Sequence, residues 1–323
     1  MGTPPVLEIE HLNVNFAAGR GAMPAVRDVS LAVAAAETVG VVGESGSGKT
    51  QLFMAAMGLL ARNAAVSGSV RFDGNELLGA PLPLLNGFRG SKLTMVFQDP
   101  MTSLTPHLPI GAQLSEVLTH HRGAASADAR RLARDMLERV RIPDPSLCLR
   151  QYPHQLSGGM RQRVMIAMSL LCNPALVIAD EPTTALDVTV QAQILELLRQ
   201  VRAEFGMALI LISHDLGVVG RIAERVLVMY AGRIVESSPT GELWRAPRHP
   251  YTAELLKCAP SLTGPLLSRL PTLAGQAPQP WQVGAGCAFA PRCSRATDLC
   301  RCERPELSGP ADRRAACHFP LTA

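Results

Sequence analysis

The chain of 323 residues has a formal net charge of +4, and 47% of its residues are hydrophobic against 18% that are charged. This balance is typical of a globular chain with one large domain or two smaller ones, and the charge is too mild to indicate a nucleic-acid binder. No apolar run reaches the roughly 18 residues of a membrane span, and the first residues lack the basic and apolar regions of a signal peptide. We therefore expect a soluble intracellular protein that meets any membrane through a partner.

The first predicted elements are strands over Leu7–Phe16 and Ala25–Val33, which alternate or run apolar. Phe16 closes the first of them. Its ring is either a core residue at the end of a strand or a surface on which a purine base stacks.

A glycine-rich loop follows the apolar predicted strand Thr38–Val42 and precedes a predicted helix over Gln51–Leu60. Its residues fit the pattern Gly-x-x-x-x-Gly-Lys-Thr, and they are Gly43, Glu44, Ser45, Gly46, Ser47, Gly48, Lys49 and Thr50. Glycines let the backbone N–H groups turn inward around an anion, and the start of the helix adds to the attraction. Lys49 is placed to reach β- and γ-phosphates, and the Thr50 hydroxyl to ligate Mg²⁺. Glycine-rich turns before helices are common, but the full pattern in this context predicts phosphate binding.

Further strands are predicted over Val66–Phe72 and Leu93–Phe97, and the second ends where Pro100 follows Gln98 and Asp99. From Ile110 to Arg141 the apolar spacing becomes helical.

A second helix start with open backbone N–H groups is predicted at Ser157, Gly158, Gly159 and Met160, where Ser157 is a candidate N-cap. It is either a simple capped helix or a second anion site, and one nucleotide does not need two such sites on one chain.

The apolar strand predicted over Ala175–Ala179 ends in Asp180 and Glu181. Carboxylates at the end of a buried parallel strand lie where α/β sheets bind ligands. Asp180 is placed to hold Mg²⁺ through water, and Glu181 to polarise an attacking water. Asp187 opens the next helix, where an N-cap role explains it on structural grounds.

The next buried strand, predicted over Met207–Ile212, leads to His214. A histidine at a strand end is more often structural than catalytic, but this one is placed to reach the same phosphate. A closing hairpin is predicted from Val226–Met229 and Arg233–Val235 around Ala231 and Gly232.

The order of the phosphate loop, Gln98, Leu-Ser-Gly-Gly, Asp-Glu and His214 resembles that of an ATP-binding cassette (ABC) ATPase over about residues 5–240. Four further segments are similar to the oligopeptide/dipeptide/nickel permease branch, and they are Phe97–Leu104, Ala179–Gln191, His249–Leu256 and the ending from Gly286 through Cys293, Cys300 and Cys317. The resemblance is to the first of the two ATPase subunits of a bacterial peptide importer.

This resemblance implies an α/β fold: a P-loop ATPase with a RecA-like core, an antiparallel β subdomain and an α-helical signature subdomain. The ATPase domain is expected over residues 1–240, with the helical subdomain at about 99–172. Residues 241–323 are expected to form a small, irregular, cysteine-rich C-terminal extension.

The resemblance also implies roles at matching positions. Phe16 stacks on adenine, Gly43 to Thr50 hold the triphosphate of ATP, and Thr50, Gln98 and Asp180 attend Mg²⁺. Gln98 senses the γ-phosphate, Glu181 is the general base, and His214 contacts the γ-phosphate. Ser157 to Met160 act in trans on ATP held by the partner, with Asp187 in the D-loop. This arrangement accounts for two anion sites on one chain.

The implied partners are a second ABC ATPase in a head-to-tail heterodimer, two transmembrane permease subunits and, indirectly, an extracytoplasmic solute-binding protein, without nucleic acid. The implied location is the cytoplasmic face of the bacterial inner membrane. Two other readings remain: a soluble ABC ATPase acting on nucleic acid or ribosomes, and a redox-gated switch. Within transport, nickel or another small solute is the alternative to peptides.

Five of the eight cysteines follow residue 286, and Cys302 stands beside four spaced as Cys287, Cys293, Cys300 and Cys317. Paired Cys-x-x-Cys zinc knuckles are absent from the sequence, and four thiolates on a longer loop suit an iron–sulfur cluster. The resemblance implies a [4Fe–4S] cluster, while zinc and free thiols stay open. Arginines in this tail, Arg292 among them, form either a solvated basic face or a surface for the cluster or a partner. The proline-rich stretch from Ala259 to Pro280 is expected to be irregular.

Overall fold

The structure, a computed structural model, describes residues 4–18, 21–184, 186–258, 273, 275–279 and 282–322, with the backbone alone at Ala18, Pro100 and Met101. Most of the proline-rich stretch expected to be irregular, Ala259 to Pro280, therefore lies outside the described residues. The chain forms two compact units. The first comprises Met1–Val6, Val33–Glu37 and Gly79–Ile210, and the second comprises Leu7–Ala32, Thr38–Leu78 and Leu211–Ala323.

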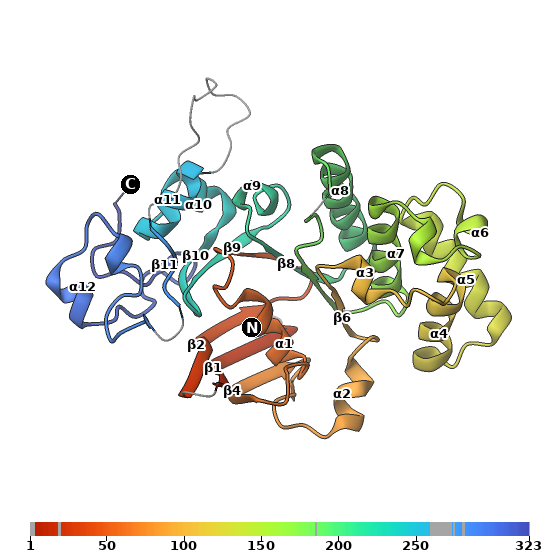
Figure 1. Cartoon of the computed structure of the whole chain (residues 1–323), viewed down its shortest axis with the longest axis horizontal. Coiled ribbons are helices and arrows are strands. Elements are labelled where there is room, and N and C mark those ends of the chain that lie inside the picture. Colours follow the sequence, from red (N-terminus) through yellow and green to blue (C-terminus); the bar gives the residue numbers. More distant parts are fainter. Residues whose placement is uncertain are drawn as a thin grey trace. The chain divides into compact units, whose positions relative to one another are not determined.

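The second unit contains a sheet with the strand order β2-β1-β4-β5, whose strands are β1 (Leu7–Ala18), β2 (Gly21–Val33), β4 (Ala64–Phe72) and β5 (Asn75–Glu76). β4 pairs antiparallel with both β1 and β5. This is the antiparallel β subdomain that the sequence predicts, and it is visible at the red and orange end of the chain in Figure 1.

The same unit contains the strand order β11-β10-β9-β3, formed by β3 (Thr38–Val42), β9 (Arg225–Tyr230), β10 (Arg233–Pro239) and β11 (Arg314–Ala315). β3 runs parallel to β9, and every residue of β3 is buried. β9 and β10 form the predicted hairpin, because Ala231 and Gly232 both take positive φ angles, 47° and 81°. β11 adds the end of the chain to this sheet by pairing with β10.

The helices of the second unit are α1 (Lys49–Ala56), α9 (Leu216–Val219), α10 (Thr240–Arg245), α11 (Pro250–Cys258), the 3₁₀ turn η3 (Ala290–Arg292) and α12 (Asp298–Cys302). α1 is shorter than the helix predicted over Gln51–Leu60. Its last turn is closed by Met57, and Gly58 takes a left-handed conformation with φ 63° that an α-helix cannot continue.

The first unit is largely helical, with two parallel strands, β6 (Leu93–Val96) and β7 (Leu176–Asp180). Its helices are α2 (Leu82–Phe88), α3 (Pro100–Ser103), α4 (Ile110–Arg122), α5 (Ser126–Arg139), α6 (Pro145–Cys148), the 3₁₀ turn η1 (Pro153–Gln155), α7 (Gly158–Leu170) and α8 (Val188–Phe205). β8 (Ala208–Ser213) is divided between the two units, since the boundary falls after Ile210.

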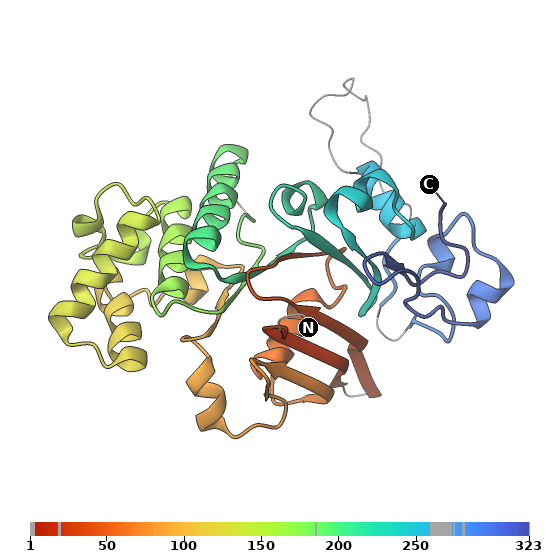
Figure 2. The same ribbon diagram turned by 180° about the vertical axis from the view of Figure 1, so that it is seen from behind.

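The predicted helical segment from Ile110 to Arg141 is two helices, because Gly123 takes φ 61° at the end of α4. α4, α5 and α7 pack on one another, as both views show (Figures 1 and 2). α5 buries one apolar face, on which Ala133 and Leu137 have 0% exposure.

Candidate functional site

The phosphate loop connects β3 to α1 and is tightly curled. A Cβ on Gly43 would lie 2.2 Å from the carbonyl oxygen of Met229, and one on Gly48, where φ is 96°, would lie 2.4 Å from that of Ala25. The glycines are therefore required at these two positions. The Lys49 side chain crosses the loop, and its Nζ donates to the carbonyl oxygens of Gly43 at 2.8 Å and Glu44 at 3.1 Å. The loop thus encloses a buried ammonium group, as an anion site requires.

Two other predicted residues belong to the same unit. Phe16 lies on β1 opposite Ala64 and is half-buried. His214 follows β8 and is exposed, while the next residue, Asp215, caps α9 by accepting a hydrogen bond from the Gly217 N–H at 2.7 Å.

The first unit brings Gln98 and Glu181 together. Val96 and Ala179 are partners in the parallel pairing of β6 and β7, so the chain leaves both strands at the same edge. The Glu181 Oε2 accepts a hydrogen bond from the Thr184 hydroxyl at 2.7 Å and one from the Gln98 Nε2 at 3.4 Å. Asp180 ends β7 with 2% exposure. A buried carboxylate, a second carboxylate and an amide therefore gather at one strand edge.

Glu181 has an unusual backbone, with φ 46° in a residue other than glycine. Such a conformation is sparsely populated, and it is often found at functional sites. Here it changes the direction of the backbone directly after a buried strand, and Pro182 follows.

Ser157 and Asp187 begin neighbouring helices in the same unit. The Ser157 Oγ accepts from the Met160 N–H at 3.3 Å, and the Asp187 Oδ1 accepts from the Val190 N–H at 2.9 Å. Both predicted N-caps are therefore confirmed. Gly159 lies in the first turn of α7, where a Cβ would come within 2.9 Å of the Val190 side chain on α8. The helix start bearing Gly158 and Gly159 is thus held against α8.

Four cysteines of the C-terminal extension line one small cavity of about 20 Å³, and they are Cys287, Cys293, Cys300 and Cys317. Burial raises the pKa of the Cys287 and Cys317 thiols, and the neighbouring thiols raise it further. Cys302 is exposed, and it is not among the described residues that line this cavity. Among the described side chains, no three His, Cys, Asp or Glu residues stand as a ready-made metal site.

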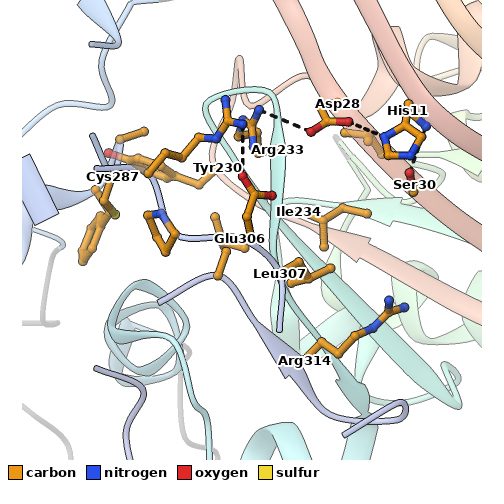
Figure 3. A pocket seen from close by; sticks show the side chains of 17 residues that line it. His11, Asp28, Ser30, Tyr230, Arg233, Ile234, Cys287, Glu306, Leu307 and Arg314 are labelled. Atoms are coloured by element: carbon orange, nitrogen blue, oxygen red, sulfur yellow. Dashed lines mark hydrogen bonds and ion pairs between the residues drawn. The ribbon is translucent and has the colours of Figure 1, made fainter. Parts of the chain in front are cut away.

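A larger cavity of about 230 Å³ adjoins the first, since Cys287 and Phe289 line both. Figure 3 shows Asp28 and Arg233 on one side of it and Cys287 on the other. Asp28 accepts a hydrogen bond from the His11 ring at 2.7 Å, which raises the pKa of His11, and Arg233 lies 3.8 Å from the same carboxylate. Residues of β2, β10 and the C-terminal extension line this cavity, all within the second unit.

One contact of the phosphate loop leaves no signal in the sequence. Arg292, which the sequence placed either in a solvated basic face or in a surface for the cluster or a partner, has a side chain that is only 6% exposed, and it pairs with Glu44. The two residues lie 248 positions apart, so no spacing or motif could have predicted their contact.

Comparison with known proteins agrees with this fold. The ABC transporter family model matches residues 26–184, and the model of the oligopeptide/dipeptide transporter C-terminal region matches residues 235–300. The ATP-binding cassette MJ0796, solved as a dimer in a post-hydrolysis state bound to ADP and phosphate, aligns with a TM-score of 0.65 and 28% identity over 72% of this chain and 98% of that one.

Relatives match over nearly the whole length. The oligopeptide transport ATP-binding protein OppD of Salmonella typhimurium is 47% identical over 98% of this chain and 94% of its own length. The protein of the same name from Haemophilus influenzae is 48% identical over 92% of each chain. The chain therefore belongs to the ABC transporter family and is an ATPase of that class. Within the family, it resembles the oligopeptide transport ATP-binding proteins in both the cassette and the C-terminal region.

In the described part of the chain, no helix has the length and apolar character needed to cross a membrane.

Proposed function

We propose that this chain lies at the cytoplasmic face of the bacterial inner membrane and powers the import of peptides into the cell. It would act with a second ATPase subunit on two membrane permease subunits, to which an extracytoplasmic solute-binding protein delivers the peptide. The observation that carries this proposal is the joining of an ABC cassette to an oligopeptide/dipeptide transporter C-terminal region in one chain. The relatives' names support peptides as the cargo, with nickel chelates and other small solutes as the alternative.

In the proposed ATP site, the loop from Gly43 to Thr50 holds the triphosphate, and Lys49 turns from the loop carbonyls to the β- and γ-phosphates. Phe16 stacks on adenine, and His214 contacts the γ-phosphate. Glu181 acts as the general base, because it directly follows a buried strand and its carboxylate is oriented by Thr184.

Mg²⁺ would be held by Thr50, Gln98 and Asp180, and it would neutralise charge on the phosphates. These residues fit a hard cation, since they supply oxygen donors and Asp180 is a buried carboxylate at a strand end.

The start of α7 is proposed to act in trans. Ser157, Gly158, Gly159 and Met160 would close over ATP held by the second subunit, arranged head to tail, and Asp187 would lie in the D-loop of the same interface. The dimeric state of the solved cassette MJ0796 supports this pairing. ATP binding would then close the pair and hydrolysis would open it, and motion of the helical subdomain would drive the permease.

We further propose that Cys287, Cys293, Cys300 and Cys317 hold a [4Fe–4S] cluster. The support is that the four thiols face one cavity, whose lining also includes apolar groups such as Phe289 and Pro305. Such a set of donors suits an iron–sulfur cluster or zinc, and the sequence lacks the paired knuckles of a zinc ribbon. The thiols must lose their protons on loading, because thiolates are the ligands.

Peptide import is tested with the complete transporter in proteoliposomes. We expect ATP-dependent uptake of labelled oligopeptides when the solute-binding protein is present. A nickel chelate offered in the same way should not be taken up. Uptake of the chelate without uptake of peptide would assign the alternative cargo.

The cluster is tested by the iron, sulfide and zinc content of anaerobically purified protein. We expect about four irons and four sulfides per chain. Cys287→Ser should lose them, and Cys302→Ser should retain them because Cys302 is exposed outside the cavity. One zinc per chain, or no metal at all, would contradict the cluster while leaving the ATPase assignment intact.

A further inference from the structure

A bidentate ion pair connects the C-terminal extension to the phosphate loop. The Arg292 Nη1 lies 2.7 Å from the Glu44 Oε2, and the Arg292 Nη2 lies 2.9 Å from the Glu44 Oε1. The side chains are 6% and 26% exposed, respectively. Two parallel charge-assisted hydrogen bonds in a mostly dry setting are stronger and more directional than an exposed pair.

Aromatic rings surround this ion pair. The Arg292 guanidinium lies 5.9 Å from the centroid of the Tyr230 ring and 6.0 Å from that of Phe289, and its Nη1 donates to the Tyr230 hydroxyl at 3.3 Å. Tyr251 on α11 is fully buried beside Tyr230, with ring centroids 4.6 Å apart. The Arg292 side chain is therefore fixed on several sides before it meets Glu44.

Glu44 is the point where these contacts reach the nucleotide loop. Its backbone N–H donates to the Tyr251 hydroxyl at 3.0 Å, and its carbonyl oxygen accepts from the Lys49 Nζ at 3.1 Å. The same carbonyl accepts from the Ser47 N–H at 3.1 Å. Glu44 thus connects the C-terminal extension to Lys49 and to the turn at Ser47 within the phosphate loop.

We infer that Arg292 is a positioning residue for ATP binding, which holds the phosphate loop in its curled form through Glu44. The C-terminal extension, and not the cassette alone, then sets the affinity for nucleotide. This inference rests on the proposal that the loop binds ATP. It goes beyond that proposal by assigning part of the binding energy to a residue outside the cassette.

The chain offers a matched control pair. On α8, the Arg199 Nε and Nη2 donate to the Glu196 carboxylate at 2.8 and 2.7 Å, but these side chains are 58% and 42% exposed. Arg199→Met breaks a bidentate arginine–glutamate pair in the other unit and leaves the phosphate loop unchanged. It therefore shows how much the loss of such a pair alone changes the Kd for nucleotide.

The test is a fluorescence titration of the full chain with Mg²⁺ and a fluorescent ATP analogue. We expect Arg292→Met to raise the Kd for the analogue about tenfold. Arg292→Lys should raise it about threefold, because one ammonium cannot replace the two parallel hydrogen bonds of the guanidinium. Arg199→Met should leave the Kd within about twofold of wild type. Wild-type affinity in both Arg292 variants would overturn the inference. Failure of the wild-type chain to bind the analogue would instead overturn the proposed function.

A double variant separates positioning from simple charge neutralisation. In Arg292→Met, the Glu44 carboxylate is left without this arginine near the triphosphate, and repulsion alone would weaken binding. Adding Glu44→Gln removes that charge but does not restore the tether. We expect Arg292→Met/Glu44→Gln to remain at least about fivefold weaker than wild type. Recovery to the wild-type Kd would overturn the positioning role.

Hydrogen exchange of the nucleotide-free chain provides an independent readout. Amides of residues 45–49 should exchange faster in Arg292→Lys than in wild type, while amides of α5 should not change. Equal exchange of the loop in both proteins would contradict the inference even if Arg292→Met proves too unstable to purify.

Discussion

Glu181 shows at the scale of one residue how the fold prepares a carboxylate. Its backbone takes a left-handed conformation at the end of a buried strand, and the Thr184 hydroxyl and the Gln98 amide both donate to its Oε2. A general base must be held within reach of a water without being neutralised by a cation. Amide and hydroxyl donors orient the carboxylate without adding a positive charge of their own.

Replacing Glu181 by glutamine should therefore separate binding from chemistry. We expect Glu181→Gln to bind ATP with near wild-type Kd and to lower the hydrolysis rate by roughly 10² to 10⁴. Steady-state phosphate release together with nucleotide binding on the same protein measures both. Hydrolysis within about threefold of wild type would remove Glu181 from the role of base.

Gly48 gives a prediction about stability. Gly48→Ala places a Cβ 2.4 Å from the Ala25 carbonyl oxygen at a φ of 96°, so backbone must move. We expect it to lower the free energy of unfolding by about 2 kcal/mol or more.

Gly46→Ala is the control: φ is 78°, but within the described part of the chain its Cβ meets no atom inside 4 Å. It should cost only about 1 kcal/mol of backbone strain in urea unfolding. Equal losses would show that the close approach at Gly48 is unimportant.

At the scale of elements, apolar spacing and glycines were good guides. The strands before the phosphate loop and before Asp180, the hairpin of β9 and β10, and the caps at Ser157 and Asp187 all lie where the sequence predicts them. Element boundaries are predicted less well, since β2 begins at Gly21 and not at Ala25, and α1 ends at Ala56 and not at Leu60. Gly58 and Gly123 end helices with left-handed φ angles, and apolar periodicity alone does not register where such a glycine interrupts it.

The packing of α5 yields a prediction for the helical region. Leu137 has 0% exposure, and α5 packs on α4 and α7. We expect Leu137→Ala to lower the free energy of unfolding by about 2–5 kcal/mol through lost burial and a cavity. Arg130→Ala on the exposed side of the same helix should stay within about 0.5 kcal/mol of wild type. A small effect at Leu137 in urea unfolding would contradict the packing of α5 against α4 and α7.

Across the whole molecule, the residues proposed to act on ATP are spread along the sequence from Phe16 to His214, and those at the start of α7 are proposed to act on ATP held by a second subunit. Sequence motifs predicted which residues these are, because phosphate chemistry constrains residue type and order. They did not predict the ion pair of Arg292 with Glu44, since a contact across 248 positions follows from the tertiary fold and leaves no local pattern. The resemblance did group Cys287, Cys293, Cys300 and Cys317, and these four thiols line one cavity.

The proposed action in trans predicts an asymmetric defect. Ser157→Arg fills the start of α7 with a long side chain, so this chain should still bind ATP at its own loop with near wild-type Kd. In the assembled pair, hydrolysis at the site of the second subunit should fall at least about tenfold. Trapping of nucleotide at each site in the purified complex distinguishes the site of this chain from that of the second subunit. Normal hydrolysis at both sites would rule out the role in trans.

Coupling of this chain to peptide import is tested by measuring ATP hydrolysis of the complete transporter with and without a peptide-loaded solute-binding protein. We predict that the loaded binding protein stimulates hydrolysis several-fold, and that Glu181→Gln in this chain removes most of the stimulated rate. Hydrolysis that is indifferent to the peptide-loaded protein, or stimulation that survives Glu181→Gln unchanged, would contradict the claim that this chain couples ATP hydrolysis to peptide import.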